Sequence, residues 1–488
     1  LSFCFSASAL QDLKLVGNQL CTADGNPIQL RGWSTHGSWF KHCYDDEQDF
    51  AEQKKKGANM ARIAMYINEG DGIDPNWVKS CIDFCANQNL YCIVDWHVLR
   101  DRDGDGSKGN PLDMKDQAVS FFQDITKYVT EKNYNHVIYE ICNEPNNNVQ
   151  GDVYVLGMGK DKKEPNKRYE SVWKWIKDYS KEVLPVIKKN DSDAIVLVGT
   201  PQWDQGLVFP MMDPIDECGL QVMYSFHYYA GDQERYLGFL SGASAFLPLF
   251  VSEWGLSSHT GDSGCDTKSA DHLLEVCNGK NLGNQIISWA NWSWADKGET
   301  SGTFTGGGYQ NMSFSEAGKY VCSKLAEGDN FKTREAKAYQ GVAQEFNGND
   351  DFILKMELFD EGGHGNAYYD FEDANWHPCY PDQCNAGYKE GKITLRGDER
   401  VDLGYCNEND KENSLVNLGY IAQGEWVQYT INVKYAADYE FETYTTDAID
   451  YNAMAIAVDG ENALVDEDGN EINRVVELQT SGSGQIDA

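Results

Sequence analysis

Residues 58–97, ANMARIAMYINEGDGIDPNWVKSCIDFCANQNLYCIVDWH, contain the unit that decides the fold. Two short runs rich in β-branched, aromatic and other apolar residues, 58–66 and 91–97, enclose NWVKSCIDFCANQ (76–88), whose apolar residues recur with helical spacing. This order predicts a strand, a helix and a second strand. Such a unit is typical of a parallel sheet, because two parallel strands need a crossover connection between them.

The same alternation extends in both directions along the chain. It follows a predicted hairpin made of KLVGNQL (14–20), a turn at Asp24-Gly25, and PIQLRGW (27–33). Further helices are predicted at 116–132 and 171–190. Counting PIQLRGW, eight strands are predicted: 27–33, 58–66, 91–97, 136–144, 194–200, 221–227, 249–253 and 286–292. Eight strand–helix units favour an α/β fold of the closed (β/α)8 TIM-barrel type over an open doubly wound sheet.

The pattern changes after residue 327. A polar, charged stretch is followed by runs in which apolar and polar residues alternate with period two, such as ILKMELFD (353–360) and EWVQYTINV (425–433). We therefore expect residues 10–327 to form the catalytic barrel, 328–350 a linker, and 351–488 a smaller all-β module.

Composition excludes several classes of partner. The 488 residues carry 41 Lys and Arg against 77 Asp and Glu, a formal net charge of −36. A phosphate backbone or an anionic membrane surface would be repelled by such a chain, so nucleic acid and membranes are not expected partners. The 13 tryptophans and 27 tyrosines suit stacking on uncharged, flat faces such as those of sugars.

The N-terminus and the cysteines indicate a secreted protein. Residues 1–9, LSFCFSASA, form a short apolar run that ends in the small-x-small pattern recognised by signal peptidase, so we expect them to be a residual signal peptide. Fourteen cysteines fit an oxidising compartment in which disulfides form. Without Cys4 their number is odd, and Cys142, in an apolar strand, is the predicted buried free thiol. No apolar run reaches the roughly 20 residues that cross a bilayer. We expect a monomer without a membrane anchor.

The chemistry is predicted at the C-terminal ends of the strands, where TIM-barrel enzymes place their catalytic groups. These ends are rich in polar and aromatic residues: His36, Arg62, Tyr66, His97, Asn143, Glu144, His227, Tyr229, Glu253 and Trp292. Glycoside cleavage with retention needs one carboxylic acid to protonate the leaving oxygen and one carboxylate to attack the anomeric carbon. Glu144 and Glu253 are the predicted catalytic pair.

The neighbours of the two glutamates should separate their roles. Arg62 and Tyr229 are expected to keep Glu253 ionised, whereas Glu144 faces this like charge and is expected to stay protonated. Asn143 suits a hydrogen bond to the sugar 2-hydroxyl. His97 and His227 are expected to orient the substrate and the carboxyl groups.

The motifs at these strand ends form a recognisable series. They are HGSW (36–39), ARIAMY (61–66), VDWH (94–97), NEP (143–145), HYY (227–229), SEWG (252–255) and NWSWADKGE (291–299). In this order they resemble the bacterial-type endoglucanase branch of glycoside hydrolase family five, over about residues 14–325.

The resemblance implies a retaining cellulase with Glu144 as acid/base and Glu253 as nucleophile. It also implies that Trp39, Trp203 and Trp292 stack on glucosyl rings and that Lys297 and Glu299 hydrogen-bond sugar hydroxyls. His36 and Tyr66 complete the expected substrate-binding set, and the expected partner is a β-glucan such as cellulose.

The C-terminal part resembles carbohydrate-binding module family six, a jelly-roll β-sandwich, over about residues 345–488. Tyr388 aligns with a ring of that family's sugar cleft, whereas Trp426 is expected in the core. Because SGSGQIDA (481–488) ends where further strands are expected, we predict a truncated module with an exposed edge.

Alternatives and cofactors complete the sequence-based expectations. A β-mannanase or a mixed-linkage glucanase on the same scaffold is one alternative, because specificity depends on groups around the 2-hydroxyl and on loop shape. A non-catalytic carbohydrate-binding protein is the other. Residues 101–106 imitate the start of an EF-hand loop, but Leu112 stands where a bidentate Glu is required. No GxGxxG or GxxxxGK[ST] pattern opens any of the predicted helices, so nucleotide binding gains no support. No metal or organic cofactor is therefore expected.

Overall fold

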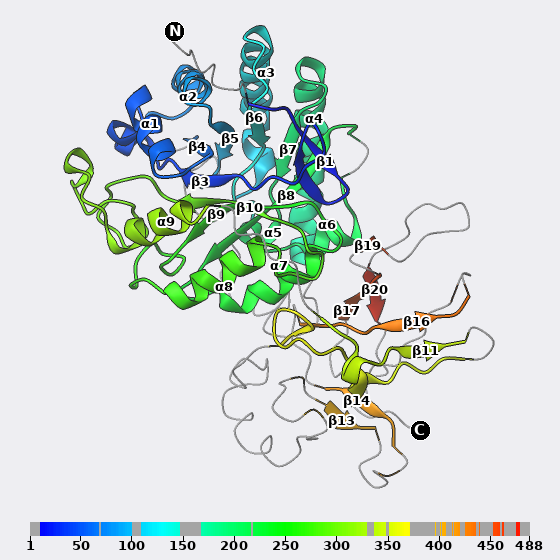
Figure 1. Cartoon of the computed structure of the whole chain (residues 1–488). Helices are drawn as coiled ribbons and strands as arrows, with labels where there is room; N and C mark the ends of the chain where they lie inside the picture. Colours follow the sequence, from blue (N-terminus) through cyan, green and yellow to red (C-terminus); the bar gives the residue numbers. More distant parts are fainter. Residues whose placement is uncertain are drawn as a thin grey trace, which may run out of the picture.

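The computed structural model describes residues 10–67, 70–99, 109–146, 167–215, 218–328, 336–347 and 351–370, together with shorter stretches between 396 and 478 (Figure 1). Three predicted features lie outside the described residues: the signal-peptide remnant at 1–9, the Asp-rich loop at 101–106, and Tyr388. Among the described residues, no helix combines the length and the apolar character needed to cross a membrane.

Eight parallel strands close into a barrel, which confirms the predicted (β/α)8 architecture. The order around the barrel is β10-β3-β4-β5-β6-β7-β8-β9, so each strand pairs with its neighbours in sequence and the last strand pairs with the first. The strands are β3 (Arg31–Ser34), β4 (Met60–Tyr66), β5 (Tyr91–His97), β6 (Val137–Glu140), β7 (Ile195–Val198), β8 (Gln221–Tyr229), β9 (Leu249–Gly255) and β10 (Ser288–Trp292).

The predicted N-terminal hairpin contains one turn more than expected. Strands β1 (Leu13–Val16) and β2 (Gln19–Thr22) pair with each other antiparallel, and Val16 opposes Gln19 across a turn at Gly17. The predicted turn at Asp24-Gly25 forms as well, because the Gly25 N–H donates to the Thr22 carbonyl at 2.8 Å and the Thr22 N–H donates to the Asn26 carbonyl at 2.9 Å. Gly17 adopts a positive φ of 55°, which glycine allows without strain. The later turn makes only a single bridge, between Cys21 and Pro27, and the chain then enters the barrel at β3.

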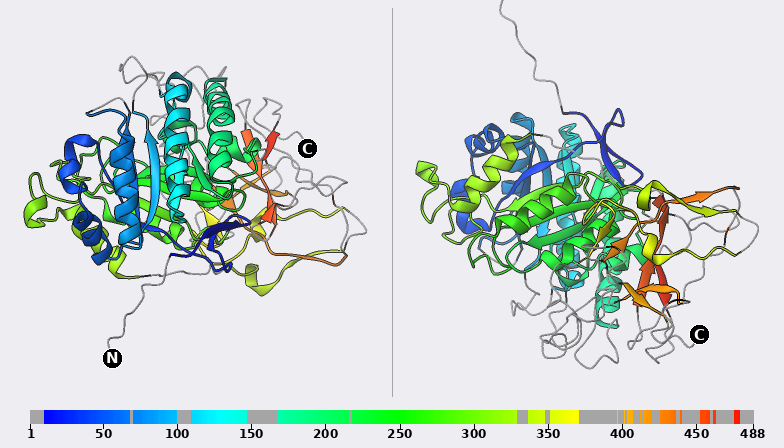
Figure 2. Two further views of the ribbon diagram at one scale, coloured as in Figure 1. Left: turned by 90° about the horizontal axis from the view of Figure 1, so that it is seen from above. Right: turned by 60° about the horizontal axis from the view of Figure 1, so that its bottom comes forward.

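Helices surround the strands, as the views in Figure 2 show. They are α1 (Glu47–Lys55), α2 (Pro75–Asn87), α3 (Lys115–Glu131), α4 (Lys167–Asn190), α5 (Pro201–Asp204), α6 (Val208–Met212), α7 (Leu237–Ala243), α8 (Thr267–Cys277) and α9 (Glu316–Ala326), with short 3-10 helices η1 (Ser38–Cys43), η2 (Pro111–Met114), η3 (Glu234–Tyr236), η4 (Tyr309–Asn311), η5 (Tyr339–Gly341) and η6 (Met356–Leu358). Side-chain caps define several starts: Asp74 accepts from the Trp77 N–H at α2, and Asp266 accepts from the Ser269 N–H at α8.

The barrel interior is apolar at one end and polar at the other. Alternate residues of each strand face inward, since the side-chain period of a strand is two. The lower interior forms one buried cluster that includes Leu30, Met60, Tyr91, Ile93, Ile138, Ile195, Leu197, Met223, Phe250 and Ala290. Leu20 of the hairpin belongs to the same cluster, and Leu13 and Leu15 pack against it. The hairpin therefore extends the lower core, and the opposite end is left for chemistry.

The described residues beyond 336 form short strand pairs. They are β11 (Gln344–Phe346) with β16 (Ile431–Val433), β12 (Tyr368–Tyr369) with β15 (Trp426–Val427), β13 (Leu403–Tyr405) with β14 (Val416–Leu418), β17 (Asn452–Ala455) with β20 (Val475–Leu478), and β18 (Ala457–Val458) with β19 (Glu461–Asn462). Trp426 is buried, as predicted. The jelly-roll topology and the truncation of the module remain predictions.

The cysteines differ from the expectation of a disulfide-bonded protein. All eleven cysteines in the described part of the chain are unpaired, and Cys142 is among the buried ones. Disulfide formation thus finds no support in these residues.

Candidate active site

Toward the C-terminal end of the strands, the inward-facing residues change from apolar to ionisable. On β4, Met60 is followed on the same face by Arg62, and on β5, Ile93 is followed by Asp95 and His97. Ile138 on β6 is followed in the same way by Glu140. All of these polar side chains are buried. Buried charges must be paired to be tolerated, and the contacts below show how this is achieved.

Arg62 is the centre of the buried polar network. Its Nε donates to Glu140 at 2.6 Å, its Nη1 to Glu253 at 3.0 Å, and its Nη2 to Asn143 at 2.8 Å. The Nη2 also lies 2.9 Å from a carboxylate oxygen of Asp95. One guanidinium, which stays charged in proteins, therefore holds three carboxyl groups and one amide in a fixed arrangement.

Glu253 reaches this network because of an irregularity in β9. The pairing with β8 shifts between Ser225 and His227, so that His227 lies opposite Glu253. The pairing of β9 with β10 shifts as well. A bulge inserts one residue and redirects the side chains that follow. The carboxyl of Glu253 accepts from the Tyr229 hydroxyl at 2.6 Å and from Arg62, so both of its oxygens are oriented.

Glu144 follows β6 in a left-handed backbone conformation, with φ of 46°. Its N–H donates to the Asp204 carboxylate at 2.8 Å, and its side chain lies 2.9 Å from Nδ1 of His227. Although 21% of the side-chain surface is exposed, burial raises the pKa of Glu144 to about 7, and the positive charge of Arg62 opposes this rise in part. A carboxylic acid with this pKa can give up a proton near neutral pH.

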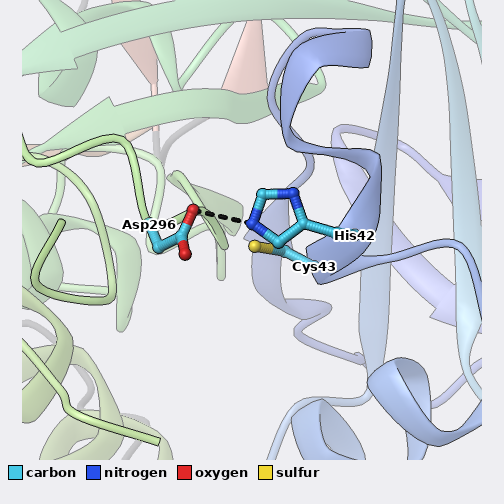
Figure 3. A group of neighbouring side chains, drawn as sticks. All are labelled: His42, Cys43 and Asp296. Carbon is cyan, nitrogen blue, oxygen red and sulfur yellow. Dashed lines mark hydrogen bonds and ion pairs between the residues drawn. The ribbon is translucent and has the colours of Figure 1, made fainter. Parts of the chain in front are cut away.

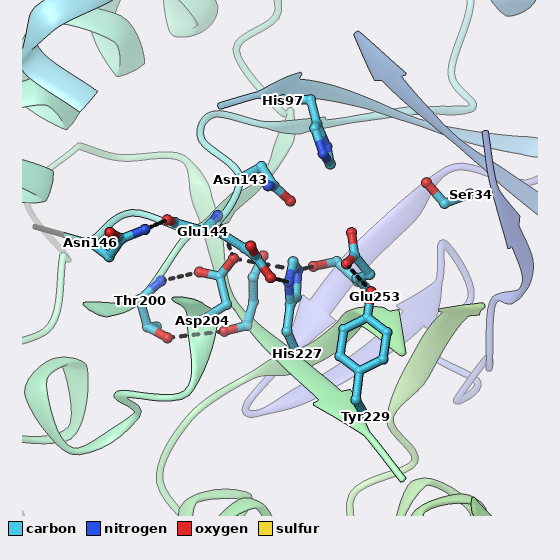
Figure 4. A network of polar contacts seen from close by, with 12 residues as sticks. Ser34, His97, Asn143, Glu144, Asn146, Thr200, Asp204, His227, Tyr229 and Glu253 are labelled. Atoms are coloured by element: carbon cyan, nitrogen blue, oxygen red, sulfur yellow. Dashed lines mark hydrogen bonds and ion pairs between the residues drawn. The ribbon is translucent and has the colours of Figure 1, made fainter. Parts of the chain in front are cut away.

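His227 links the acid to the rest of the site (Figure 4). Its Nε2 lies 3.1 Å from the Ser252 hydroxyl and 3.4 Å from Asp204, opposite the nitrogen that contacts Glu144. Burial lowers the pKa of His227 to about 4, so the ring is neutral near pH 7. Because a neutral imidazole has one donor and one acceptor, it can accept from protonated Glu144 and donate to Ser252.

His97 is held in a comparable way. Its Nδ1 contacts the Asp95 carboxyl at 2.6 Å. Burial lowers the pKa of His97 to about 3 and raises that of Asp95 to about 7. The ring stacks against Tyr66 at 4.2 Å and Trp292 at 5.4 Å between centroids.

Aromatic rings and a charged pair form the rest of the rim. His36 lies 4.7 Å from Trp292 between ring centroids, and Lys297 contacts Glu299 at 2.7 Å. Trp292 is 7% exposed, whereas the rings of Trp39 and Trp203 are 72% and 39% exposed.

The structure thus gathers ten of the sequence-predicted side chains at one end of the barrel: His36, Arg62, Tyr66, His97, Asn143, Glu144, His227, Tyr229, Glu253 and Trp292. Glu299 lies at the same end, with its carboxylate 3.8 Å from the His36 ring nitrogen, and Lys297 is held there by its ion pair with Glu299. Trp39 and Trp203 lie exposed on η1 and α5.

Four buried residues of the network escaped the sequence analysis: Asp95, Glu140, Asp204 and Ser252. Asp95 and Glu140 carried a usable signal, since each lies two residues after an inward-facing isoleucine of the same strand. Asp204 had no such signal. It lies after the left-handed residues Gln202 and Trp203 and accepts from the Thr200 N–H at 2.5 Å and from Glu144.

Comparisons with known proteins find similar endoglucanases. Endoglucanase E-5 of Thermobifida fusca is 33% identical over 332 residues, covering 64% of this chain and 63% of its own. An endoglucanase of Clostridium saccharobutylicum is 32% identical over 322 residues, covering 63% and 64%. The chain therefore spans less than two thirds of the length of these relatives.

A solved structure matches the barrel. The catalytic domain of Thermobifida fusca endoglucanase Cel5A superposes with a TM-score of 0.54 at 31% identity, covering 65% of this chain and 98% of that domain. The family model described as cellulase (glycosyl hydrolase family 5) matches residues 21–298, which include every residue of the buried polar network around Arg62. The chain belongs to glycosyl hydrolase family 5.

Proposed function

We propose that this protein is a retaining endo-β-1,4-glucanase that cleaves internal bonds of cellulose and related β-glucans by double displacement. The observation that carries the proposal is the spacing of the two glutamates. One carboxyl oxygen of Glu144 and one of Glu253 lie within 4.8 Å of each other. Retaining enzymes separate their carboxyl groups by about 5 Å, whereas inverting enzymes leave roughly 6.5–9.5 Å for a water molecule.

The contacts assign each glutamate a step. Glu253, held by Arg62 and Tyr229, attacks the anomeric carbon while Glu144 gives its proton to the leaving oxygen. A covalent glycosyl ester on Glu253 results. In the second step a water oxygen attacks the anomeric carbon while ionised Glu144 takes a proton from that water. The Glu253 carboxylate leaves, and the configuration at the anomeric carbon is inverted a second time. The net result is retention of configuration.

A β-glucan is the substrate class that the surroundings favour. The two relatives above are endoglucanases, and a variant of the Thermobifida fusca catalytic domain has been solved in complex with cellotetraose. The flat rings of His36, Tyr66 and Trp292 lie against one another beside the glutamates and suit the apolar face of a glucosyl unit. Trp39 and Trp203 offer exposed rings for sugar units further along the chain.

The remaining expectations belong to the same proposal. A secreted enzyme with a C-terminal jelly-roll sugar-binding module would stay near an insoluble polymer, which raises the effective substrate concentration. The charge of −36 and the sugar-stacking aromatics support a soluble enzyme acting on neutral polysaccharide.

The test compares wild type with Glu253→Gln and Glu144→Gln on carboxymethylcellulose, measuring reducing ends and viscosity, with β-mannan in parallel. Glu131→Gln, on the exposed side of α3, is the matched control. We expect rapid loss of viscosity that both active-site substitutions abolish, and NMR of cello-oligosaccharide hydrolysis should show the β-anomer first. Cleavage of mannan alone would replace the substrate, initial release of the α-anomer would refute retention, and inactivity on both polymers would favour a carbohydrate-binding role.

A further inference from the structure

A second group of chemically reactive side chains lies outside the catalytic network (Figure 3). His42 and Cys43 are the last two residues of η1, and Asp296 lies in the segment after β10. The His42 Nε2 is 3.0 Å from an Asp296 carboxylate oxygen. Ligand atoms of all three residues, including the Cys43 sulfur, lie within 4.8 Å of one another.

We propose that His42, Cys43 and Asp296 bind a divalent transition-metal ion of the zinc class. Imidazole nitrogen, thiolate sulfur and carboxylate oxygen are the ligands that zinc takes in proteins, whereas calcium and magnesium require oxygen ligands. Around a tetrahedral zinc ion, neighbouring ligand atoms are roughly 3.5 Å apart. The observed group is close to this size, so small side-chain movements complete the site.

Burial also suits a metal ion with one open position. Cys43 is fully buried and the Asp296 side chain is 8% exposed, so two ligands are fixed by their surroundings. The His42 ring is 51% exposed, which provides an entry path and room for a water molecule as fourth ligand. When the sulfur–metal bond forms, the thiol proton leaves to solvent and the metal takes its place.

The position of the site gives it a consequence for the rim. Its residues join η1, which also carries Trp39, to the segment that carries Lys297. A bound ion would connect these two segments, which are about 250 residues apart in sequence, and should stabilise the fold by binding only the native state. This inference does not depend on the proposed glucanase activity.

The metal probe must distinguish this site from the candidate active site, which could also bind an ion. Glu144, His227 and Glu253 form another group among the described residues that could hold an ion. That group contains no sulfur. A cobalt–thiolate charge-transfer band in the near ultraviolet therefore distinguishes the two sites, and Co²⁺ is the probe for the experiment.

The full-length chain is treated with a chelator, dialysed and titrated with Co²⁺, and Zn²⁺ is then added in competition. We expect a thiolate charge-transfer band that Zn²⁺ removes and that Cys43→Ser lacks, while Cys322→Ser, a half-buried cysteine on α9, keeps it. His42→Asn, an exposed position that folding should tolerate, should weaken Co²⁺ binding at least about tenfold. Excess Zn²⁺ should raise the Tm of wild type by roughly 5 °C and leave that of His42→Asn nearly unchanged.

Two results would overturn the proposal. A wild-type protein without the charge-transfer band would show that Cys43 is not a ligand. A band that persists unchanged in His42→Asn would show that His42 is not a ligand of this ion, and a Zn²⁺-induced Tm rise that persists unchanged would place the ion elsewhere, for example at Glu144, His227 and Glu253.

Discussion

Replacing Asp204 by Asn tests whether this fully buried residue positions Glu144, the proposed catalytic acid. In the native structure one carboxylate oxygen of Asp204 accepts the Thr200 N–H at 2.5 Å, and the other accepts the Glu144 N–H at 2.8 Å. The second oxygen also lies 3.4 Å from His227. An Asn side chain has a single acceptor oxygen, so one buried N–H loses its partner and the carboxylate beside His227 is lost.

The expected magnitudes follow from these contacts. An unsatisfied buried N–H costs about 1–3 kcal/mol, which lowers the Tm of a domain of about 320 residues by roughly 1.5–4.5 °C. Glu144 has a positive φ of 46°, a conformation that persists only when its surroundings hold it. A displacement of about 1 Å at a catalytic group costs about 100-fold in rate, so we expect kcat on cello-oligosaccharides to fall roughly 10- to 100-fold with little change in KM.

The assay uses two substrates and one control variant. Dinitrophenyl cellobioside has a leaving group that needs no protonation, so its kcat should fall much less than that of cellotetraose if the acid alone is misplaced. Asp191→Asn is the control, because Asp191 is a half-buried aspartate that lies before β7, away from Glu144, and accepts from Tyr139 at 3.0 Å. If Asp204→Asn lowers Tm but leaves kcat within about twofold of wild type, Asp204 is only structural and the reasoning fails.

Three further results are expected. Because the pKa of Glu144 is raised to about 7 and the acid must be protonated, kcat/KM should fall with rising pH through about pH 7, approaching tenfold per pH unit; a profile flat to pH 9 would contradict this assignment. Tyr229→Phe removes the 2.6 Å bond to Glu253 and should cost about 1.5–3 kcal/mol of transition-state stabilisation, seen as a roughly 10- to 150-fold loss of kcat/KM with an unchanged fold by circular dichroism. Arg62→Met leaves Asp95, Glu140 and Glu253 without their common cation and should destabilise the protein by about 3–5 kcal/mol in urea unfolding, whereas a loss below 1 kcal/mol would show that the network relaxes or binds water.

The barrel could be predicted from the sequence because the spacing of apolar residues indicates whether a segment forms a strand or a helix. The run YCIVDWH (91–97) predicted a buried strand, and Ile93, Asp95 and His97 already show by their spacing of two that they share one face. Eight such runs alternating with helices leave few architectures other than a closed barrel. The N-terminal hairpin was predicted less completely: the turn at Asp24-Gly25 forms, but KLVGNQL (14–20), predicted as one strand, is divided at Gly17 into β1 and β2.

The two glutamates proposed as catalytic could be placed at strand ends for the same reason, because Asn143-Glu144 and Glu253 follow apolar runs directly. The orientation of their side chains could not be predicted. Period-two alternation from Phe250 would turn Glu253 away from the interior, and only the bulge on β9, set by its pairing with both neighbouring strands, directs it to Arg62 and Tyr229.

Contacts between distant segments were decided by the tertiary structure alone. Asp204 supports Glu144 from 60 residues away, and Asp296 meets His42 from 254 residues away. Neither pair leaves a periodic trace in the sequence. Strand and helix periodicity reflects the geometry of one backbone segment, whereas these contacts depend on where barrel closure brings the ends of separate segments.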